Sequence, residues 1–285
     1  MTPGGAGAVI RAGLRRDTAG VDLAGATVLV TGANRGIGLA LARRLAREPL
    51  GRLLAGARDP AGFPAVEVPA GGAAELRPVR MDLSSRATIE AGCAELGDAL
   101  HEVDLLINNA GQMTGGLLEE QDIERVYAMF QVNLVAVAHL SARVLPGMLS
   151  RHAGKIVTNA SISGFAFFPG ASTYAAAKAG AVALTESLRR ELRGTGVSTL
   201  LLVTPGVDTG MLDDTEEVYG RHMDTSSWER ESPDQWAEKV LGAIRSDATR
   251  VNPGGRVAWA VRAAKGPAQV MDLVSARMFT RTPRR

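Results

Sequence analysis

Short runs of aliphatic and β-branched residues alternate with longer amphipathic stretches along the chain from Ala26 onward. The short runs predict strands, and the amphipathic stretches predict helices because their apolar positions recur every three or four residues. The predicted strands cover residues 26–31, 52–57, 76–81, 103–108, 155–160, 197–203 and a short segment near 250. The predicted helices cover residues 36–48, 84–99, 119–150, 173–193 and 233–245. This alternation is typical of a parallel sheet with helices on both faces.

The connection between the second and third strands does not follow this alternation of strands and helices. Residues 60–75 are rich in proline and glycine, so we expect a short or broken helix there, with Asp59 as its N-cap. Nothing between residues 23 and 250 resembles an interdomain linker. The sequence therefore predicts one α/β domain over residues 23–255, with a doubly wound, mostly seven-stranded parallel sheet. A flexible leader (1–22) precedes it, and a basic amphipathic extension (256–285) follows.

Composition narrows the class of protein. Hydrophobic residues make up 46% of the 285 residues and charged residues 22%, as in soluble globular proteins and unlike disordered chains. No uninterrupted apolar run approaches the ~18–20 residues that span a bilayer, and the N-terminus lacks the pattern of a secretory signal. The single cysteine, Cys93, excludes an internal disulfide, and the histidines lack the spacing of metal ligands. We expect a cytoplasmic protein without a bound metal.

The small net charge of +2 is distributed unevenly. Residues 251–285 contain seven Lys or Arg and one Asp, whereas residues 23–250 contain 22 basic and 27 acidic side chains. An acidic body argues against a nucleic-acid-binding protein. In the basic extension, four apolar residues between 270 and 278 keep helical spacing, which is compatible with a helix on a membrane surface. We favour packing over the protein's own pocket or against a neighbouring subunit.

A glycine-rich segment, Thr31 to Gly38, joins the first strand to the first helix. Gly32 permits a tight exit from the strand, Gly36 lets the backbone approach a pyrophosphate at the helix N-terminus, and Gly38 permits close packing of helix on sheet. The loop is completed by Asn34, Arg35 and Ile37. Its spacing, G-x3-G-x-G, differs from the common G-x-G-x-x-G pattern, and alone it is equally compatible with an ordinary turn.

The end of the second strand indicates which dinucleotide binds. An acidic residue there would hold the ribose hydroxyls of NAD, whereas an arginine favours the 2′-phosphate of NADP. The sequence has Ala57 at the expected acid position, followed by Arg58. Arg35 in the glycine loop supplies a second cation. The sequence therefore predicts NADP, with NADPH preferred over NADH. The alternative for Arg58 is a solvated surface arginine.

Six further motifs follow in a fixed order: Asp82-Leu83, Asn108-Asn109-Ala110-Gly111, Asn133, Ser161, Tyr174-Ala-Ala-Ala-Lys178 and Pro205-Gly206. Together with the glycine loop, this order over residues 23–255 resembles the short-chain dehydrogenase/reductase family. The resemblance implies a Rossmann-type NAD(P)-dependent oxidoreductase. It also implies further cofactor contacts at Asp82, Leu83, Asn109, Ala110, Gly111, Tyr174, Lys178, Pro205, Gly206, Val207 and Thr209. The segment after Pro205 is one residue shorter than the family pattern, which leaves the geometry of Thr209 open.

Four residues form the candidate catalytic set. Tyr174 and Lys178 are four residues apart, so on a helix they share one face. A tyrosine of ordinary pKa near ~10 is a poor base, and a neighbouring ammonium lowers that pKa by stabilising the phenolate. The resemblance implies that Lys178 also binds the nicotinamide ribose, that Ser161 holds the substrate oxygen, and that Asn133 supports a water chain to Lys178. Taken separately, each of the four also fits an ordinary structural role.

Apolar side chains suggest the class of substrate. Three phenylalanines lie between Ser161 and Tyr174, and four more large residues lie in the two other loops that the family places around the pocket. The expected pocket residues are Met113, Ser161, Phe165, Phe167, Phe168, Met211, Tyr219 and Trp228. They favour an apolar or aromatic ketone, aldehyde or alcohol as substrate, although some of these rings fit a core or subunit contact equally well. The alternatives are a 3-oxoacyl-(acyl carrier protein) reductase and a non-catalytic NADP(H)-sensing regulator.

The two longest predicted helices suggest an oligomer. Residues 119–150 and 173–193 carry more apolar positions than one sheet surface needs, notably Val135, Val137, Leu140, Val144, Val182 and Leu188. The family pairs these two helices across a two-fold axis. We therefore expect a homodimer or a homotetramer.

Overall fold

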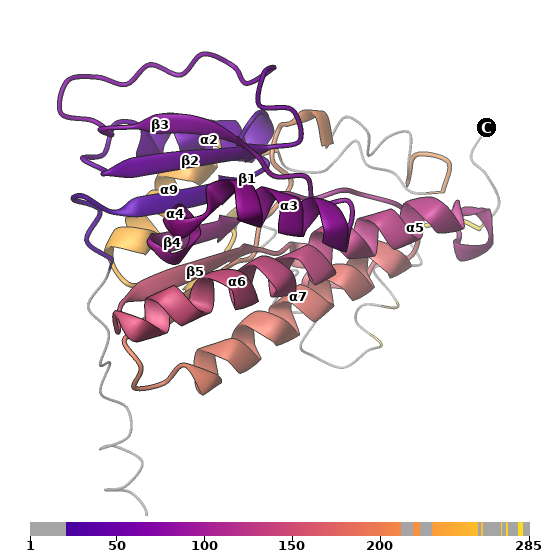
Figure 1. Cartoon of the computed structure of the whole chain (residues 1–285). Coiled ribbons are helices and arrows are strands. Elements are labelled where there is room, and N and C mark those ends of the chain that lie inside the picture. The colour runs from indigo at the N-terminus through magenta and orange to yellow at the C-terminus, as the bar shows by residue number, and fades with distance from the viewer. Residues whose placement is uncertain are drawn as a thin grey trace, which may run out of the picture.

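A seven-stranded, fully parallel sheet forms the centre of the protein (Figure 1). The computed structural model describes residues 21–211, 219–222, 230–255, 258, 269, 272 and 279–281. The strands are β1 (Thr27–Thr31), β2 (Arg52–Ala57), β3 (Leu76–Arg80), β4 (Val103–Asn108), β5 (Gly154–Asn159), β6 (Val197–Leu202) and β7 (Arg250–Val251). Their order is β3-β2-β1-β4-β5-β6-β7, so the chain reverses its direction of winding between β1 and β4. The predicted α/β fold, doubly wound around a parallel sheet, is confirmed.

Helices cover both faces of this sheet, as Figure 1 shows. One face carries α2 (Gly36–Leu45) and α9 (Pro233–Arg245). The other carries α3 (Arg86–Leu96), α4 (Asp98–His101), α6 (Ala136–Ser150) and α7 (Ser172–Glu191). The remaining helical segments are η1 (Leu118–Glu120), α5 (Ile123–Phe130), the π-helical turn η2 (Gln131–Val135) and η3 (Ile162–Gly164).

The hydrophobic core lies in two layers, one on each side of the sheet. Strand β1 is buried at every position, and its side chains alternate between the layers. Val28 and Val30 pack beneath α2 and α9, whereas Leu29 packs beneath α3 and α6. A strand covered on both faces carries apolar residues at successive positions, as at Val28, Leu29 and Val30, which explains the continuous run that predicted it.

The connection from β2 to β3 is not helical. Residues 58–75, all of which the structure describes, form turns and extended chain. The Asp59 carboxylate accepts a hydrogen bond from the Ala61 N–H at 3.0 Å, and the Phe63 N–H bonds to the Pro60 carbonyl. The predictions of a short helix and of a helix-capping Asp59 were therefore wrong. Pro64 and Pro69 follow this turn, and they prevent it from continuing into a helix because proline has no N–H donor.

The stretch predicted as one helix over residues 119–150 begins later and contains a wider turn. Helix α5 starts at Ile123, after Asp122 caps it by accepting a hydrogen bond from the Glu124 N–H. The π-helical turn η2 then joins α5 to α6. By length and composition alone, Ile123–Ser150 is apolar enough to cross a membrane, with a mean hydropathy of 1.4. Half of that apolar stretch is buried inside the protein, as expected of a core helix.

The apolar positions that predicted an oligomer have mixed locations. Leu140 and Val144 are buried against the sheet, and Val137 is buried as well, so none of the three forms an external surface. Val182 and Leu188 are half-buried. Val135 is exposed, and the same helical run also exposes Ile123 and Tyr127.

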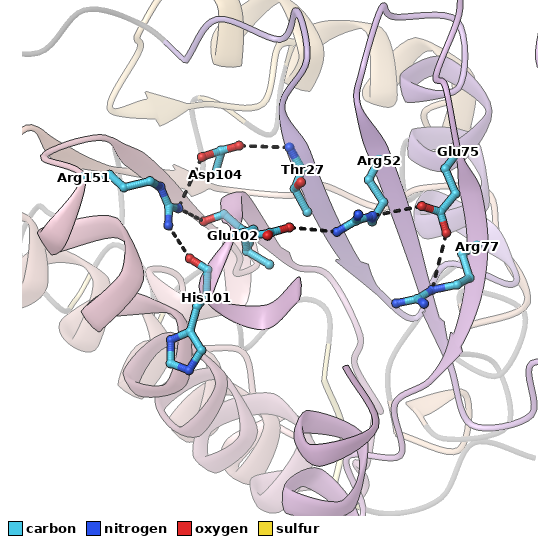
Figure 2. Close-up of polar contacts among 9 residues, drawn as sticks. Thr27, Arg52, Glu75, Arg77, His101, Glu102, Asp104 and Arg151 are labelled. Atoms are coloured by element: carbon cyan, nitrogen blue, oxygen red, sulfur yellow. Dashed lines mark hydrogen bonds and ion pairs between the residues drawn. The ribbon is translucent and has the colours of Figure 1, made fainter. Parts of the chain in front are cut away.

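An ion-pair network ties together the amino ends of the strands (Figure 2). The Arg52 guanidinium bonds to Glu75 at 2.9 Å and to Glu102 at 3.0 Å, which links β2 to the starts of β3 and β4. Arg151 bonds to Asp104, whose carboxylate also accepts the Thr27 N–H at 2.9 Å. This network holds one edge of the sheet and leaves the opposite, carboxyl edge for the candidate site.

Candidate active site

A cavity of about 770 Å³ opens at the carboxyl ends of the strands, around the point between β1 and β4 where the winding reverses. This is where ligands bind in open α/β sheets. The lining includes all eighteen residues that the sequence assigned to cofactor binding. The parallel strands bring them together because their carboxyl ends share one edge of the sheet.

The glycine loop fits the backbone of a dinucleotide. Gly32 and Gly36 both have positive φ angles, +62° and +54°, which L side chains rarely adopt. A Cβ atom on Gly38 would lie 2.0 Å from the Gly32 carbonyl oxygen, so only glycine permits this contact of helix and loop. Among the described residues, the N-cap side chain of Arg35 makes no hydrogen bond to the first N–H groups of α2. Those N–H groups provide a site for a pyrophosphate.

The basic side chains predicted to bind a 2′-phosphate lie in the same cavity. Arg58 follows β2 and Arg35 precedes α2, and both line the cavity. Buried Ala57 occupies the strand end, where an acidic residue would bind the ribose hydroxyls of NAD and repel a 2′-phosphate. Asp82 also lines the cavity, and its carboxylate accepts a hydrogen bond from the Ser84 N–H at 3.0 Å. This end of the cavity is therefore suited to a phosphorylated adenosine.

A chain of side-chain hydrogen bonds runs beneath the cavity and joins four strand ends. The Thr31 hydroxyl accepts the N–H groups of Asn109 and Ala110, each at 3.0 Å. The Asn109 amide donates to the Thr31 carbonyl and accepts from the Asn159 amide at 3.0 Å. Thr204 completes the chain by donating to Asn159. Sequence reasoning missed Asn159 and Thr204, whose only signal is a polar side chain at the end of a buried strand.

Tyr174 and Lys178 lie on one face of α7, as their spacing predicted, with Ser161 opposite them. The Lys178 ammonium is 5.8 Å from the centre of the Tyr174 ring and donates to the Asn159 carbonyl at 2.9 Å. Burial raises the pKa of Tyr174 to about 12, and a hydrogen bond with Ser161 acts in the opposite direction. Burial lowers the pKa of Lys178 to about 8. Desolvation therefore outweighs the hydrogen bond with Ser161 in this structure, and the expected lowering of the Tyr174 pKa by Lys178 stays a prediction.

Asn133 acts on the loop after β4 rather than on the cavity. Its side chain accepts the Gln112 N–H at 2.9 Å and donates to the Gln112 carbonyl at 2.8 Å. A Cβ atom on Gly111 would lie 3.3 Å from the Asn133 amide oxygen and 3.6 Å from the Lys178 ammonium. Asn133 is buried and is not among the described residues that line the cavity. The structure thus gives Asn133 a positioning role, and its predicted link to a water chain stays a prediction.

The substrate end of the cavity carries several of the apolar side chains that the sequence predicted. Of the predicted pocket residues, Met113, Ser161, Phe168, Met211 and Tyr219 line it. The prediction was wrong for two residues: Phe165 packs under the Arg250 guanidinium, which lies 4.9 Å from the centre of its ring, and Phe167 is 63% exposed. Trp228 lies outside the described residues.

The structure also adds residues that the sequence did not indicate. The substrate end is lined by Gln112, Thr114, Arg125, Ala171 and others that have no diagnostic spacing. Thr209, whose position the shortened loop left open, lies above the glycine loop: its methyl group would be 3.1 Å from a Cβ on Gly36. Within the described part of the chain, no cluster of His, Cys, Asp or Glu is placed to hold a metal ion.

Comparison with known proteins gives a consistent result. The family model for short chain dehydrogenase matches residues 26–219. The chain is 34% identical to the ketoacyl reductase HetN of Nostoc sp., over 80% of this chain and 78% of that protein. It is 36% identical to the 1-deoxy-11-beta-hydroxypentalenate dehydrogenase of Streptomyces exfoliatus, over 77% and 79% of the two chains.

Among solved structures, a short-chain dehydrogenase from Sphingobium yanoikuyae in complex with NADPH superposes with a TM-score of 0.69. It is 28% identical and covers 88% of this chain and 95% of its own. The family match spans the glycine loop, Ser161, Tyr174 and Lys178, which the fold gathers around one cavity. The chain therefore belongs to the short chain dehydrogenase family.

Proposed function

We propose that the protein is an NADP(H)-dependent oxidoreductase that acts on an apolar or aromatic substrate. It transfers a hydride between the nicotinamide and the carbon of a carbonyl group or of the corresponding secondary alcohol. One observation carries the proposal. Ser161, Tyr174 and Lys178 lie together at one end of a cavity whose other end presents Arg35 and Arg58 beside the glycine loop. The NADPH in the Sphingobium structure agrees with the cofactor predicted here from Arg35 and Arg58.

The residues of the chain suit carbonyl reduction. When bound, the cofactor supplies the hydride. With a pKa near 12, Tyr174 holds its proton at neutral pH and donates it to the substrate oxygen as negative charge develops there. Ser161 donates a hydrogen bond to the same oxygen, which stabilises that charge. Lys178, protonated below pH 8, stabilises the phenolate left behind and would bind the ribose hydroxyls.

A second candidate is reduction of a 3-oxoacyl group carried by an acyl carrier protein. The name of the related Nostoc protein, a ketoacyl reductase, supports it. So does Arg125, an exposed cation on α5 that lines the cavity and is suitable for an acidic carrier. The apolar side chains of Met113, Phe168 and Met211 favour the first proposal, because they accommodate a free hydrophobic substrate.

A substrate screen separates these proposals. Apolar ketones, 3-oxoacyl thioesters and secondary alcohols would each be tested with NADP(H) and NAD(H), and kcat/KM compared. We expect the highest value for an apolar or aromatic ketone with NADPH. Turnover confined to thioesters would favour the second candidate. NADPH binding without turnover of any compound would favour a non-catalytic regulator.

Arg58→Asp should abolish or reverse the preference for NADPH over NADH. The substitution replaces an attractive charge by a repulsive one beside the proposed 2′-phosphate site, and loss of a charged hydrogen bond of ~1.5–3 kcal/mol weakens binding about 10- to 100-fold. Dissociation constants of both cofactors provide the measurement. Arg43→Asp is the matched control: Arg43 is exposed on α2 outside the cavity, and the net charge changes equally. Equal constants for the two cofactors in the unmodified protein would contradict the assignment.

NADPH affinity should fall as the pH rises through about 8. Burial lowers the pKa of Lys178 to about 8 in the free protein, whereas hydrogen bonding to the ribose favours the ammonium. The pKa of Lys178 is therefore higher in the NADPH complex than in the free protein. Deprotonation of Lys178 weakens NADPH binding, by about fivefold if ~1 kcal/mol is lost. Titrations between pH 6.5 and 9.5 test this, with Lys178→Met as the comparison. The same decline in Lys178→Met would contradict the assignment.

We also propose a homo-oligomer that buries the exposed apolar side chains of α5 and η2. Ile123, Tyr127 and Val135 are 60%, 69% and 49% exposed on one helical run. Such a patch on a soluble protein is commonly an interface between subunits. Tyr127→Glu should shift the sedimentation coefficient toward that of a monomer, whereas Arg125→Glu, two residues away and on the cavity side of the helix, should not. A monomeric unmodified protein at micromolar concentration would contradict the proposal.

A further inference from the structure

Residues 279–281 lie against His222, on the substrate side of the molecule. The Thr280 N–H donates to the His222 carbonyl at 2.9 Å, and the Thr280 carbonyl lies 3.0 Å from the His222 Nδ1. The Phe279 ring lies against the His222 ring, with their centres 6.0 Å apart. We call residues 279–281 the C-terminal strap. Figure 1 shows this last coloured part of the chain beside the start of α5.

The strap and His222 also contact η1, before α5. The second nitrogen of the His222 ring, Nε2, faces the Glu120 carboxylate at 3.2 Å. Arg281 pairs with the neighbouring Glu119. His222 is only 2% exposed, so its bonds lie inside the protein, whereas the Arg281 pair is on the surface and contributes little. Buried His222 is therefore the centre of a contact among three separate segments.

This contact adjoins a wall of the substrate end of the cavity. The His222 N–H donates to the Tyr219 carbonyl at 2.9 Å, so the two residues belong to one turn. Tyr219 lines the cavity, and its hydroxyl donates to the Thr114 carbonyl at 3.2 Å. Its ring packs in one cluster with Met113, Phe168 and Ala171. The turn is thus held at one end by the cavity wall and at the other by the strap.

We propose that the C-terminal strap, through His222, positions Tyr219 as a wall of the substrate site and so determines how bulky a carbonyl compound the site accepts. The inference rests on the proposed function, since it places the substrate beside Tyr219. His222 and Thr280 are positioning residues, because neither lines the cavity itself. A small substrate makes few contacts with Tyr219, whereas the binding of a bulky substrate depends on the position of the Tyr219 ring. The strap should therefore affect KM and selectivity much more than cofactor binding.

Thr280→Pro tests the strap with a minimal change. Proline removes the N–H that bonds to His222, whereas the matched control Thr280→Ala keeps it. We expect Thr280→Pro to change KM for a bulky aromatic ketone by about fivefold or more, the equivalent of one lost hydrogen bond. We expect KM for a small ketone, kcat and the NADPH dissociation constant to stay within about twofold, and Thr280→Ala to resemble the unmodified protein.

Truncation provides a second pair of variants. A chain that ends at Met278 lacks the strap, whereas one that ends at Arg281 keeps it and serves as the control. His222→Ala should reproduce the selectivity change of the first chain, and Arg281→Ala should not. If the first chain and Thr280→Pro bind NADPH poorly and unfold at lower temperature with unchanged selectivity, the strap only stabilises the fold and the proposal is overturned.

Hydrogen exchange tests the positioning without any turnover. Loss of the strap should speed exchange at residues 219–222 and 114–121, while exchange in β1 and β4 stays unchanged. Equal exchange at 219–222 in Thr280→Pro and Thr280→Ala would overturn the proposal. If no carbonyl compound is reduced by the unmodified protein, the proposed function fails, whereas the exchange result still decides whether the strap positions Tyr219.

Discussion

Tyr174→Phe should lower turnover of a carbonyl substrate by about 10²–10⁴-fold, the loss typical of removing a general acid. The substitution keeps the ring that packs with Met113 and Met129 but removes the proposed proton donor. The NADPH dissociation constant should change by less than about twofold, because that hydroxyl lies near Ser161 and not at the glycine loop. Steady-state rates and a binding titration with one ketone measure both effects.

Three further substitutions make the result specific. Tyr127→Phe removes the same atom from a tyrosine that is 69% exposed on α5, and it should leave turnover unchanged. Lys178→Met should impair both turnover and NADPH binding, because its ammonium is assigned to both. Ser161→Ala should impair turnover alone. A folded Tyr174→Phe variant with near-normal turnover would show that the proton comes from another group.

Asp247→Asn should lower the free energy of unfolding by about 3 kcal/mol, because it leaves a buried ammonium without its counter-ion. Lys155, in β5, is completely buried, and its ammonium lies 2.5 Å from the Asp247 carboxylate. Asp247 also lies within 3.5 Å of the Ser198 hydroxyl and has a φ of +50°. Asparagine tolerates that backbone conformation, so the substitution removes the charge without adding strain.

Urea denaturation gives the free energies, and two variants serve as controls. Glu238→Gln removes a similar charge from the exposed pair with Arg44 and should have little effect. The double variant Lys155→Met/Asp247→Asn should regain most of the lost stability, since both buried charges are then absent. If Asp247→Asn were as stable as Glu238→Gln, the pair would make no large contribution to folding.

Regular elements could be predicted from the sequence where burial requires a continuous apolar run in a strand or an apolar face in a helix. The limits of β2, β4 and α9 agree with the predicted residues 52–57, 103–108 and 233–245. The connection after β2 could not be predicted, because Pro and Gly exclude a long helix without specifying the turns that replace it. The π-helical turn around Asn133 has no sequence signal of its own, since its hydrophobic spacing resembles that of an α-helix.

The candidate site was predicted where motifs lie at strand ends, because the parallel sheet brings these ends to one edge. The substrate end was predicted less well. Phe165 and Phe167 follow Ser161 closely in sequence, yet the turn after η3 directs them toward Arg250 and toward solvent. The raised pKa of Tyr174 depends on burial by residues distant in sequence, and so does the contact of His222 with Thr280. Neither follows from local pattern or spacing.

Transfer of a label from cofactor to substrate tests the proposed function most directly. The protein would be incubated with an apolar aryl ketone and NADPH that carries deuterium at the transferable position of the nicotinamide, and the product analysed by mass spectrometry. The proposed function predicts an alcohol with one deuterium on the former carbonyl carbon, formed faster than with deuterated NADH. Absence of the labelled alcohol, with NADPH bound and the protein folded, would contradict it.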